Sequence, residues 1–325
     1  MSNLMLYVVS VLIWGSTWLA INYQVESVDP KVSVVYRYAI AAILLFAWCL
    51  ARRLKLRFDR AAHGRFLLLG IFLFSLNYIG TYSAQQYISS ALNAVTFSTM
   101  MWMNVINTRI FFGTPIKSRV YFGAALGMVG IIVLFWPELA DLNLSEYTLI
   151  GAGFCLSAAL LASFGNMVSQ KSQREGLPVL QANAWGMLYG TLITGAIALV
   201  QGAEFVFTPT TSYIVSLLYL AVFGSIVAFG TYLKLVGNIG AEKAGYAVVM
   251  FPVVALILAV LFEGLAIETH LVIGVIAVLL GNVVILVTAR QWRTLWRWFT
   301  EVPPRTDMAI ETDAATPVCA DKSAR

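Results

Sequence analysis

Charged side chains are scarce in this chain of 325 residues. Asp, Glu, Lys and Arg together make up 11% of it, whereas soluble domains carry about 25%. Hydrophobic residues account for 60%, so too few polar groups remain to cover a water-exposed surface of this size. The composition therefore excludes an ordinary soluble domain and predicts a polytopic membrane protein.

Histidine and cysteine are also rare, with two and three residues respectively. His63 and His270 fall in separate loops, and Cys49, Cys155 and Cys319 are widely spaced, so neither a metal site nor a disulfide framework is expected. The sequence has no G-x-x-x-x-G-K-[ST] phosphate loop and no G-x-S-x-G nucleophile motif. We therefore expect no cofactor, no metal and no catalytic residues.

Long apolar runs dominate what remains. Stretches of roughly 20 apolar residues, the length that crosses a bilayer as a helix, run approximately over 3–22, 32–51, 66–86, 90–112, 119–137, 147–169, 180–202, 211–235, 240–262 and 269–289. Continuous runs favour helices over the alternating strands of a barrel. We therefore predict an all-α polytopic membrane protein with about ten transmembrane helices. The first stretch lacks a positive leading region, so we expect a retained helix rather than a signal peptide.

Lysine and arginine gather on one side of the predicted helices. Nineteen of the 21 basic residues, all but Lys31 and Arg37, fall in the even-numbered connections or the C-terminal tail. Basic loops stay on the cytoplasmic side, so both termini are predicted to be cytoplasmic. The net charge of +5 is then an orientation signal, and no nucleic-acid binding is expected.

The two halves of the chain resemble each other at an offset of 150 residues. Gly80-Thr81-Tyr82 aligns with Gly230-Thr231-Tyr232, and Met100 aligns with Met250. Five helices per half is an odd number, so the second half must enter the membrane from the opposite side. Such inverted repeats recur in secondary transporters, where the substrate site lies at the repeat interface.

The repeat divides the chain into three parts. We predict a first five-helix repeat over 1–137 and a second, inverted repeat over 138–290. The aromatic and basic residues just after 290 are typical of a helix at the cytoplasmic headgroup level. We expect 291–325 to form this interfacial segment and a disordered tail.

With this architecture, the chain resembles EamA-type members of the drug/metabolite transporter superfamily over about residues 4–289. The resemblance rests on Trp14-Gly15-Ser16-Thr17-Trp18, Tyr36-Arg37-Tyr38, Phe251-Pro252-Val253 and Phe262-Glu263-Gly264. It implies a secondary-active carrier of small metabolites that works by alternating access around a central cavity. By analogy the substrates are amino acids or related compounds, the direction is export, and the location is the bacterial cytoplasmic (inner) membrane.

One departure from the family separates the halves. Trp102 and Gly113 stand where the first half would match Pro252 and Glu263, so a role of Pro252 cannot be copied onto the first half. Pro252 removes one helical hydrogen bond, which makes it a candidate gating hinge or a fixed bend. Glu263 lies near the same outer depth as Arg37 and is a candidate partner for it.

Arg37 is the one cation that we expect within the membrane, where charges are costly and often functional. It either binds a substrate carboxylate, pairs with Glu263, reaches toward the interface, or fixes helix packing. Polar and aromatic residues of several predicted helices are further cavity candidates, although such side chains also join helices by hydrogen bonds. The cavity candidates are Trp14, Thr17, Asn22, Arg37, Asn77, Tyr78, Tyr82, Met100, Trp102, Asn104, Asn166, Tyr232 and Tyr246.

Two other features complete the expectations. The series Gly123, Gly127 and Gly130, together with Gly281, predicts close helix packing. The rival function is an intramembrane enzyme that acts on a lipid or metabolite, which would need His, Asp or Glu clustered on one membrane face. A channel or a structural membrane partner is a third alternative, and the sequence leaves the oligomeric state open.

Overall fold

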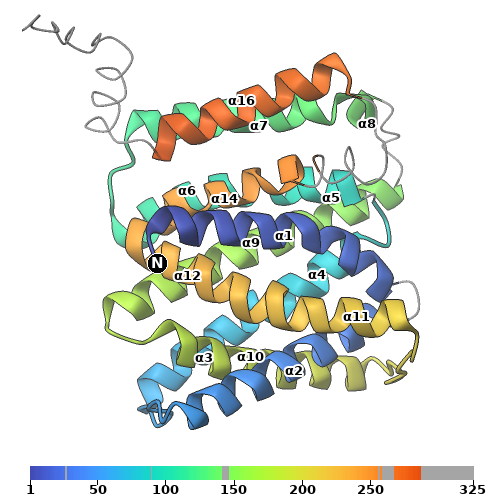
Figure 1. The fold of residues 1–325 in the computed structure, drawn as a ribbon, viewed down its shortest axis with the longest axis vertical. Coiled ribbons are helices and arrows are strands. Elements are labelled where there is room, and N and C mark those ends of the chain that lie inside the picture. The colour runs from blue at the N-terminus through green and yellow to red at the C-terminus, as the bar shows by residue number, and fades with distance from the viewer. Residues whose placement is uncertain (26–27, 89, 141–145, 255–256, 258–266, 287–325) are drawn as a thin grey trace, which may run out of the picture. The chain divides into compact units, whose positions relative to one another are not determined.

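The computed structural model describes residues 1–25, 28–88, 90–140, 146–254, 257 and 267–286, and within them all regular structure is helical (Figure 1). Residues up to Leu286 form one compact unit. The elements are α1 (Asn3–Val25), α2 (Pro30–Ala51), α3 (Arg60–Leu73), α4 (Leu76–Ala84), α5 (Ser90–Phe97), α6 (Met100–Phe112), α7 (Ser118–Leu134), α8 (Trp136–Ala140), α9 (Glu146–Arg174), α10 (Val179–Val200), α11 (Thr211–Tyr219), the π-helix η1 (Leu220–Val227), α12 (Ala228–Ile239), α13 (Ala241–Ala244), α14 (Tyr246–Val249) and α16 (Thr269–Leu286).

Most of the predicted apolar stretches are helices of the expected place and length. Those long and apolar enough to cross a membrane are Pro30–Ala51, Arg60–Ala84, Glu146–Arg174, Val179–Val200 and Thr211–Ile239. Shorter apolar helices cover Asn3–Thr17, Ser118–Leu134 and Thr269–Ile285. The stretches predicted at 90–112 and 240–262 are instead divided into short helices where the structure describes them. The all-α membrane protein is thus confirmed, while the count of ten spans stays a prediction.

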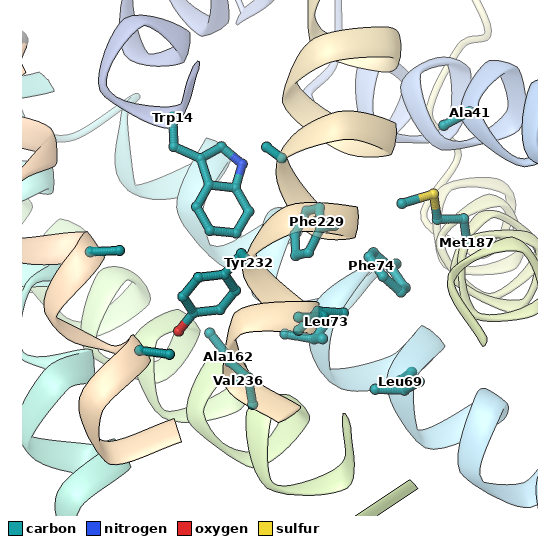
Figure 2. Packing of buried hydrophobic residues seen from close by; sticks show 14 of the residues in the cluster. Trp14, Ala41, Leu69, Leu73, Phe74, Ala162, Met187, Phe229, Tyr232 and Val236 are labelled. Atoms are coloured by element: carbon teal, nitrogen blue, oxygen red, sulfur yellow. The ribbon is translucent and has the colours of Figure 1, made fainter. Parts of the chain in front are cut away.

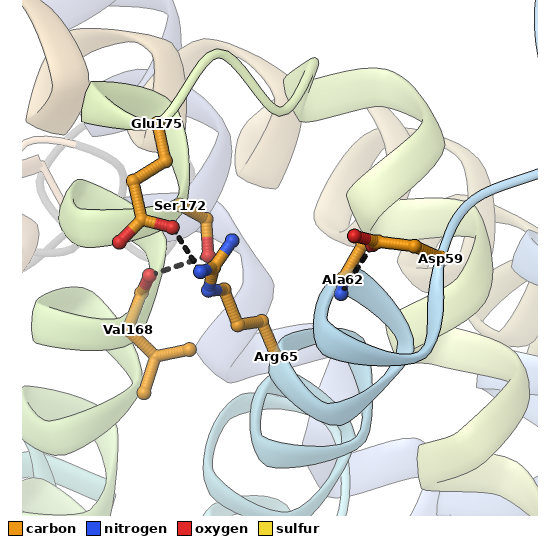
Figure 3. A network of polar contacts seen from close by, with 6 residues as sticks. All are labelled: Asp59, Ala62, Arg65, Val168, Ser172 and Glu175. Carbon is orange, nitrogen blue, oxygen red and sulfur yellow. Dashed lines mark hydrogen bonds and ion pairs between the residues drawn. The ribbon is translucent and has the colours of Figure 1, made fainter.

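Two helices begin at aspartate caps. The Asp29 carboxylate accepts a hydrogen bond from the backbone N–H of Lys31 at 2.8 Å, and Pro30 fills the first position of α2. Asp59 caps α3 in the same way through the N–H of Ala62 at 2.9 Å (Figure 3). Since a capping carboxylate satisfies backbone donors that the helix leaves free, the sequence fixes where these two helices start.

An ion pair joins the start of α3 to the end of α9. Arg65 pairs with Glu175, which directly follows α9 (Figure 3). Ser172 donates a hydrogen bond to the Val168 carbonyl one turn earlier at 2.7 Å. The two ionic side chains are about one-third exposed, so the pair contributes at most about 1 kcal/mol.

Helices α7 and α16 lie along each other (Figure 1), and glycines allow their close approach. A Cβ atom at Gly130 would lie 2.7 Å from the backbone nitrogen of Val278, and one at Gly123 would lie 2.8 Å from the carbonyl oxygen of Gly281. Both distances are shorter than an ordinary contact. The close packing predicted from the glycine series is therefore confirmed.

The largest buried cluster joins the remaining long helices. Helix α2 packs along α10, α4 lies against α9, and α1 packs along α12. Aromatic rings connect them at the centre: the ring of Phe229 lies 4.8 Å from Trp14 and 4.9 Å from Phe74, and the Trp14 ring lies 4.9 Å from Tyr232 (Figure 2).

Several helices are interrupted where they pass this cluster. Phe74 and Ser75 separate α3 from α4, and Ser98 and Thr99 separate α5 from α6. Gly245 separates α13 from α14, and η1 widens the helix between α11 and α12. Within a membrane, irregular backbone is tolerated where it is buried in protein or lines a cavity, so these interruptions indicate where a cavity should be sought.

Candidate functional site

A cavity of about 70 Å³ lies among the interrupted helices. Both halves of the chain contribute to its wall, which consists of Trp14, Thr17, Ile21, Arg37, Leu73, Asn77, Tyr78, Thr81, Phe97, Met100, Ala162, Asn166, Phe229, Tyr232, Val248 and Phe251. The wall is mainly apolar and aromatic with a few polar groups. That composition is typical of sites for small organic molecules.

Arg37 supplies the positive charge of the wall and is 1% exposed. Its Nε donates to the Ser225 hydroxyl at 2.8 Å, its Nη1 to the Tyr82 hydroxyl at 3.2 Å, and its Nη2 to the Gly224 carbonyl at 3.1 Å. The guanidinium carbon also lies 4.7 Å from the centre of the Tyr78 ring, a cation–π contact. The side chain is therefore buried and held in place by neutral groups.

The charge of Arg37 is not neutralised within the part of the chain that the structure describes. None of the ion pairs found there includes it. The three hydrogen bonds use three of the five N–H groups of a guanidinium, so two donors remain. A buried cation with free donors on a cavity wall favours a negatively charged ligand group, because uncompensated buried charge is costly.

The Gly224 backbone connects η1 with α1 and α2 next to Arg37. Its carbonyl accepts hydrogen bonds from Arg37 Nη2 at 3.1 Å and from the Trp14 indole Nε1 at 3.0 Å. A Cβ atom there would lie 3.1 Å from both Arg37 Nη2 and the Thr17 methyl group. The π-helical segment changes the regular hydrogen-bond pattern of the helix, and side chains of α1 and α2 use the carbonyl that it presents.

A polar end of the wall lies beyond the Trp14 indole. Asn166 Nδ2 donates to the Tyr232 hydroxyl at 3.1 Å and to Asn104 Oδ1 at 3.2 Å. Both amide side chains are at most 1% exposed. Trp14 shares the Gly224 carbonyl with Arg37, and the Trp14 and Tyr232 rings are 4.9 Å apart, so these two rings connect the Arg37 part of the wall with the amide part.

The structure brings most of the predicted cavity residues together. Eight of them line the cavity: Trp14, Thr17, Arg37, Asn77, Tyr78, Met100, Asn166 and Tyr232. Tyr82 and Asn104 lie directly behind the wall, where they hydrogen-bond to Arg37 and Asn166. Whether any of these residues binds a substrate stays a prediction.

Other predicted residues lie elsewhere. The Trp102 ring is 6.4 Å from that of Tyr121 on α7, and the Tyr246 hydroxyl donates to the Val120 carbonyl at 2.8 Å, so these two residues face α7 rather than the cavity. Pro252 is buried in a helical turn over 251–254, directly after an interruption at Met250. The Asn22 side chain and Glu263 are outside the described residues, and so is the predicted segment 291–325.

Sequence reasoning did not select the apolar part of the wall or the residues that hold Arg37. Ile21, Leu73, Phe97, Ala162, Phe229 and Val248 look like any other apolar residue of a membrane helix. Ser225 carried a signal that could have been used, because it aligns with Ser75 at the repeat offset of 150. Both serines lie at helix irregularities and both accept a side-chain hydrogen bond, Ser75 from Thr194 at 2.8 Å.

Comparison with known proteins gives consistent matches along the chain. The sequence model of the EamA-like transporter family matches residues 1–136 and 149–287. The uncharacterized inner membrane transporter YedA of Escherichia coli (strain K12) is 31% identical over 249 residues, which are 76% of this chain and 78% of YedA. The uncharacterized transporter YoaV of Bacillus subtilis (strain 168) is 26% identical over 286 residues, 86% of this chain and 96% of YoaV.

Two further similarities extend this picture. Protein PagO of Salmonella typhimurium is 25% identical over 285 residues, 87% of this chain and 92% of PagO. A solved crystal structure matches with a TM-score of 0.73 at 18% identity, over 92% of this chain and 99% of the solved one. The similarity to the solved structure establishes a shared fold and carries no information about the substrate.

Proposed function

Because the chain belongs to the EamA-like transporter family, we propose that it is a secondary-active carrier of small metabolites. As a member of that family it is a membrane transporter with a small-molecule substrate. Our proposal adds the mechanism, which is alternating access around the cavity between the two halves. The observation that carries it is the buried Arg37 guanidinium on the wall of that cavity, without a counter-charge in the described residues.

Ten spans in two inverted repeats are part of the proposal, and the pattern of helix contacts supports them. Shifting the chain by 150 residues exchanges α2 with α10 and α7 with α16, and each of these pairs packs together. The same shift places α1 on α9, and it places α3 and α4 on the segment of α11, η1 and α12. Helix α1 contacts that segment, and α9 makes the corresponding contact with α3 and α4. A pseudo-two-fold axis produces such reciprocal contacts.

The orientation in the membrane follows from charge and similarity. Basic residues concentrate in the even-numbered connections and the tail, so we propose that both termini face the cytoplasm. YedA is an inner membrane transporter by name, and we propose the bacterial inner membrane for this chain too.

For the substrate, we propose amino acids or related compounds, carried in the direction of export. Arg37 would bind the carboxylate through its two remaining N–H donors, and the aromatic wall would cover the rest of the molecule. Pro252 would serve as the hinge of the second half. Glu263 would act either as the partner of Arg37 in the absence of substrate or as a structural residue.

Counterflow in proteoliposomes tests the proposal. The purified protein is reconstituted, and exchange is measured with amino acids, sugars and nucleosides. We expect exchange of at least one carboxylate-bearing solute, loss of that exchange in Arg37→Gln, and little change in Lys31→Gln, a matched loss of charge on a side chain that is paired with Asp29 outside the cavity. Chromatography of the recovered solute identifies an enzyme if the solute is chemically altered.

The negative result is equally defined. A folded protein that exchanges no member of the panel would contradict the carrier function. If exchange persists in Arg37→Gln, the carrier function stands, but Arg37 is not the group that binds the carboxylate.

A further inference from the structure

The amide end of the cavity contains buried polar groups without partners. Within the described residues, Asn166 Oδ1 and Asn104 Nδ2 have no hydrogen-bond partner, although both side chains are buried. Each group left in this state costs about 1–3 kcal/mol. Native proteins rarely leave such groups unpaired, and Asn166 lies on the cavity wall, so a bound molecule can supply what is missing.

The need for a partner at Asn166 does not depend on how the amides are turned. As they stand, Asn166 uses its NH₂ group on Tyr232 and Asn104, which leaves a free acceptor on Asn166 and a free donor on Asn104. If both amides rotated by half a turn, Asn104 would donate to Asn166, and a free donor on Asn166 and a free acceptor on Asn104 would remain. In either arrangement Asn166, the amide on the cavity wall, keeps one unpaired group, which is its carbonyl oxygen as it stands and its NH₂ group after rotation.

This combination selects the chemistry of the group that fits. A hydroxyl or a primary amide both donates and accepts, so it satisfies Asn166 in either orientation of the amide. A carboxylate only accepts and an ammonium only donates, so each would satisfy Asn166 in one orientation of its amide only. A charged group at Asn166 would also be buried without a counter-ion. Arg37 is the charged residue among the described residues that line the cavity, and it is already assigned to the carboxylate of the substrate.

We propose that Asn166, held from behind the wall by Asn104, forms a subsite for an uncharged hydroxyl or amide group of a substrate whose carboxylate binds Arg37. The inference rests on the carrier function proposed above. Between the two ends lie the rings of Trp14, Phe229 and Tyr232, so the body of the substrate is aromatic or otherwise apolar. An aromatic amino acid and a plain aromatic carboxylic acid both carry these groups, and the amino acid would add an α-ammonium group to a cavity whose wall, within the described residues, includes no acidic side chain.

Two pairs of probes that differ by one hydroxyl test the subsite. They are 4-hydroxyphenylacetate against phenylacetate, and tyrosine against phenylalanine, with binding measured by scintillation proximity on the full-length purified protein. The hydroxylated member of at least one pair should bind about tenfold more tightly, equivalent to about 1.4 kcal/mol. The pair that binds identifies whether the substrate carries an α-ammonium group.

Variants assign the preference to the amides. Asn166→Ala should remove the tenfold preference and change the affinity of the probe without the hydroxyl less than about threefold. Asn107→Ala is the matched control, because Asn107 is a buried amide of α6 that donates to Ser163 at 2.9 Å and does not line the cavity. It should keep the preference. If Asn166→Ala does not fold, Asn104→Ser takes its place.

The outcomes separate the subsite from the carrier function. Equal binding within both pairs, or binding of none of the four probes, overturns the subsite, and so does a preference that persists in Asn166→Ala. If counterflow with other solutes continues in that case, the carrier function stands. A folded protein that shows the preference but exchanges no solute would retain the subsite chemistry and contradict the carrier function.

Discussion

Gly130 is the position at which one added methyl group tests the contact between α7 and α16. In Gly130→Ala the new Cβ would lie 2.7 Å from the Val278 backbone nitrogen and 2.9 Å from the Gly274 carbonyl oxygen. Ordinary contact begins at 3.4 Å, so the helices would have to separate by about 0.7 Å. Both obstructing groups are backbone, and no side-chain rotation can relieve the clash.

The expected magnitude combines two effects. Overpacking by a methyl group costs about 1–3 kcal/mol, and alanine is favoured over glycine within a helix by about 0.5–1 kcal/mol. We therefore expect a net loss of about 1–2 kcal/mol of unfolding free energy in Gly130→Ala. Gly153→Ala in α9 is the control, because no atom lies within 4 Å of a Cβ at Gly153, and it should be neutral or slightly stabilising.

Unfolding in mixed detergent micelles measures both variants against the wild type. Neither glycine lines the cavity, so ligand binding by the folded fraction should not change. Equal stability of Gly130→Ala and Gly153→Ala would refute the close backbone contact, since a Cβ atom would meet backbone atoms at Gly130 and no atom within 4 Å at Gly153.

The remaining predictions concern the cavity and its support. Arg37→Gln should weaken binding of a carboxylate probe at least about tenfold, because a hydrogen bond to a charged group contributes about 1.5–3 kcal/mol; unchanged affinity in equilibrium binding would exclude Arg37 as the receptor. Tyr246→Phe removes the hydroxyl that donates to the Val120 carbonyl and should lower unfolding stability by about 1 kcal/mol without changing probe affinity; a large change in affinity would instead assign Tyr246 to the site. In Gly245→Ala the Cβ would lie 2.7 Å from Asn104 Nδ2, so the preference for a hydroxylated probe should fall, and an unaltered preference would argue against the amide subsite.

Much of the architecture could be predicted because the membrane imposes simple rules on the sequence. Helical segments such as α2 and α10 are nearly the predicted stretches 32–51 and 180–202, since lipid requires each segment to satisfy its own backbone. The glycine contact between α7 and α16 was also predictable, because small residues recur at helical spacing. The interruptions at Ser75 and Ser98 were not, since no proline or glycine marks them.

The candidate site was predicted only where polar residues are conspicuous. Arg37 and Asn166 are rare groups in an apolar sequence and were selected for that reason. Tyr246 was selected on the same grounds, yet it supports the contact with α7. Phe229 was not selected, although it lies on the wall, because an aromatic residue of a membrane helix has the same sequence signature whether it faces lipid, a neighbour or a cavity.

The sequence by itself determined the class, the approximate helices and the uneven distribution of charge. These depend on local composition, which the bilayer reads segment by segment. Only the tertiary structure decided that Ser225 and the Gly224 carbonyl hold Arg37, and that Asn104 and Asn166 meet with unpaired amide groups. Those contacts join residues from different helices, and their formation depends on how the helices pack, which no single segment of the sequence specifies.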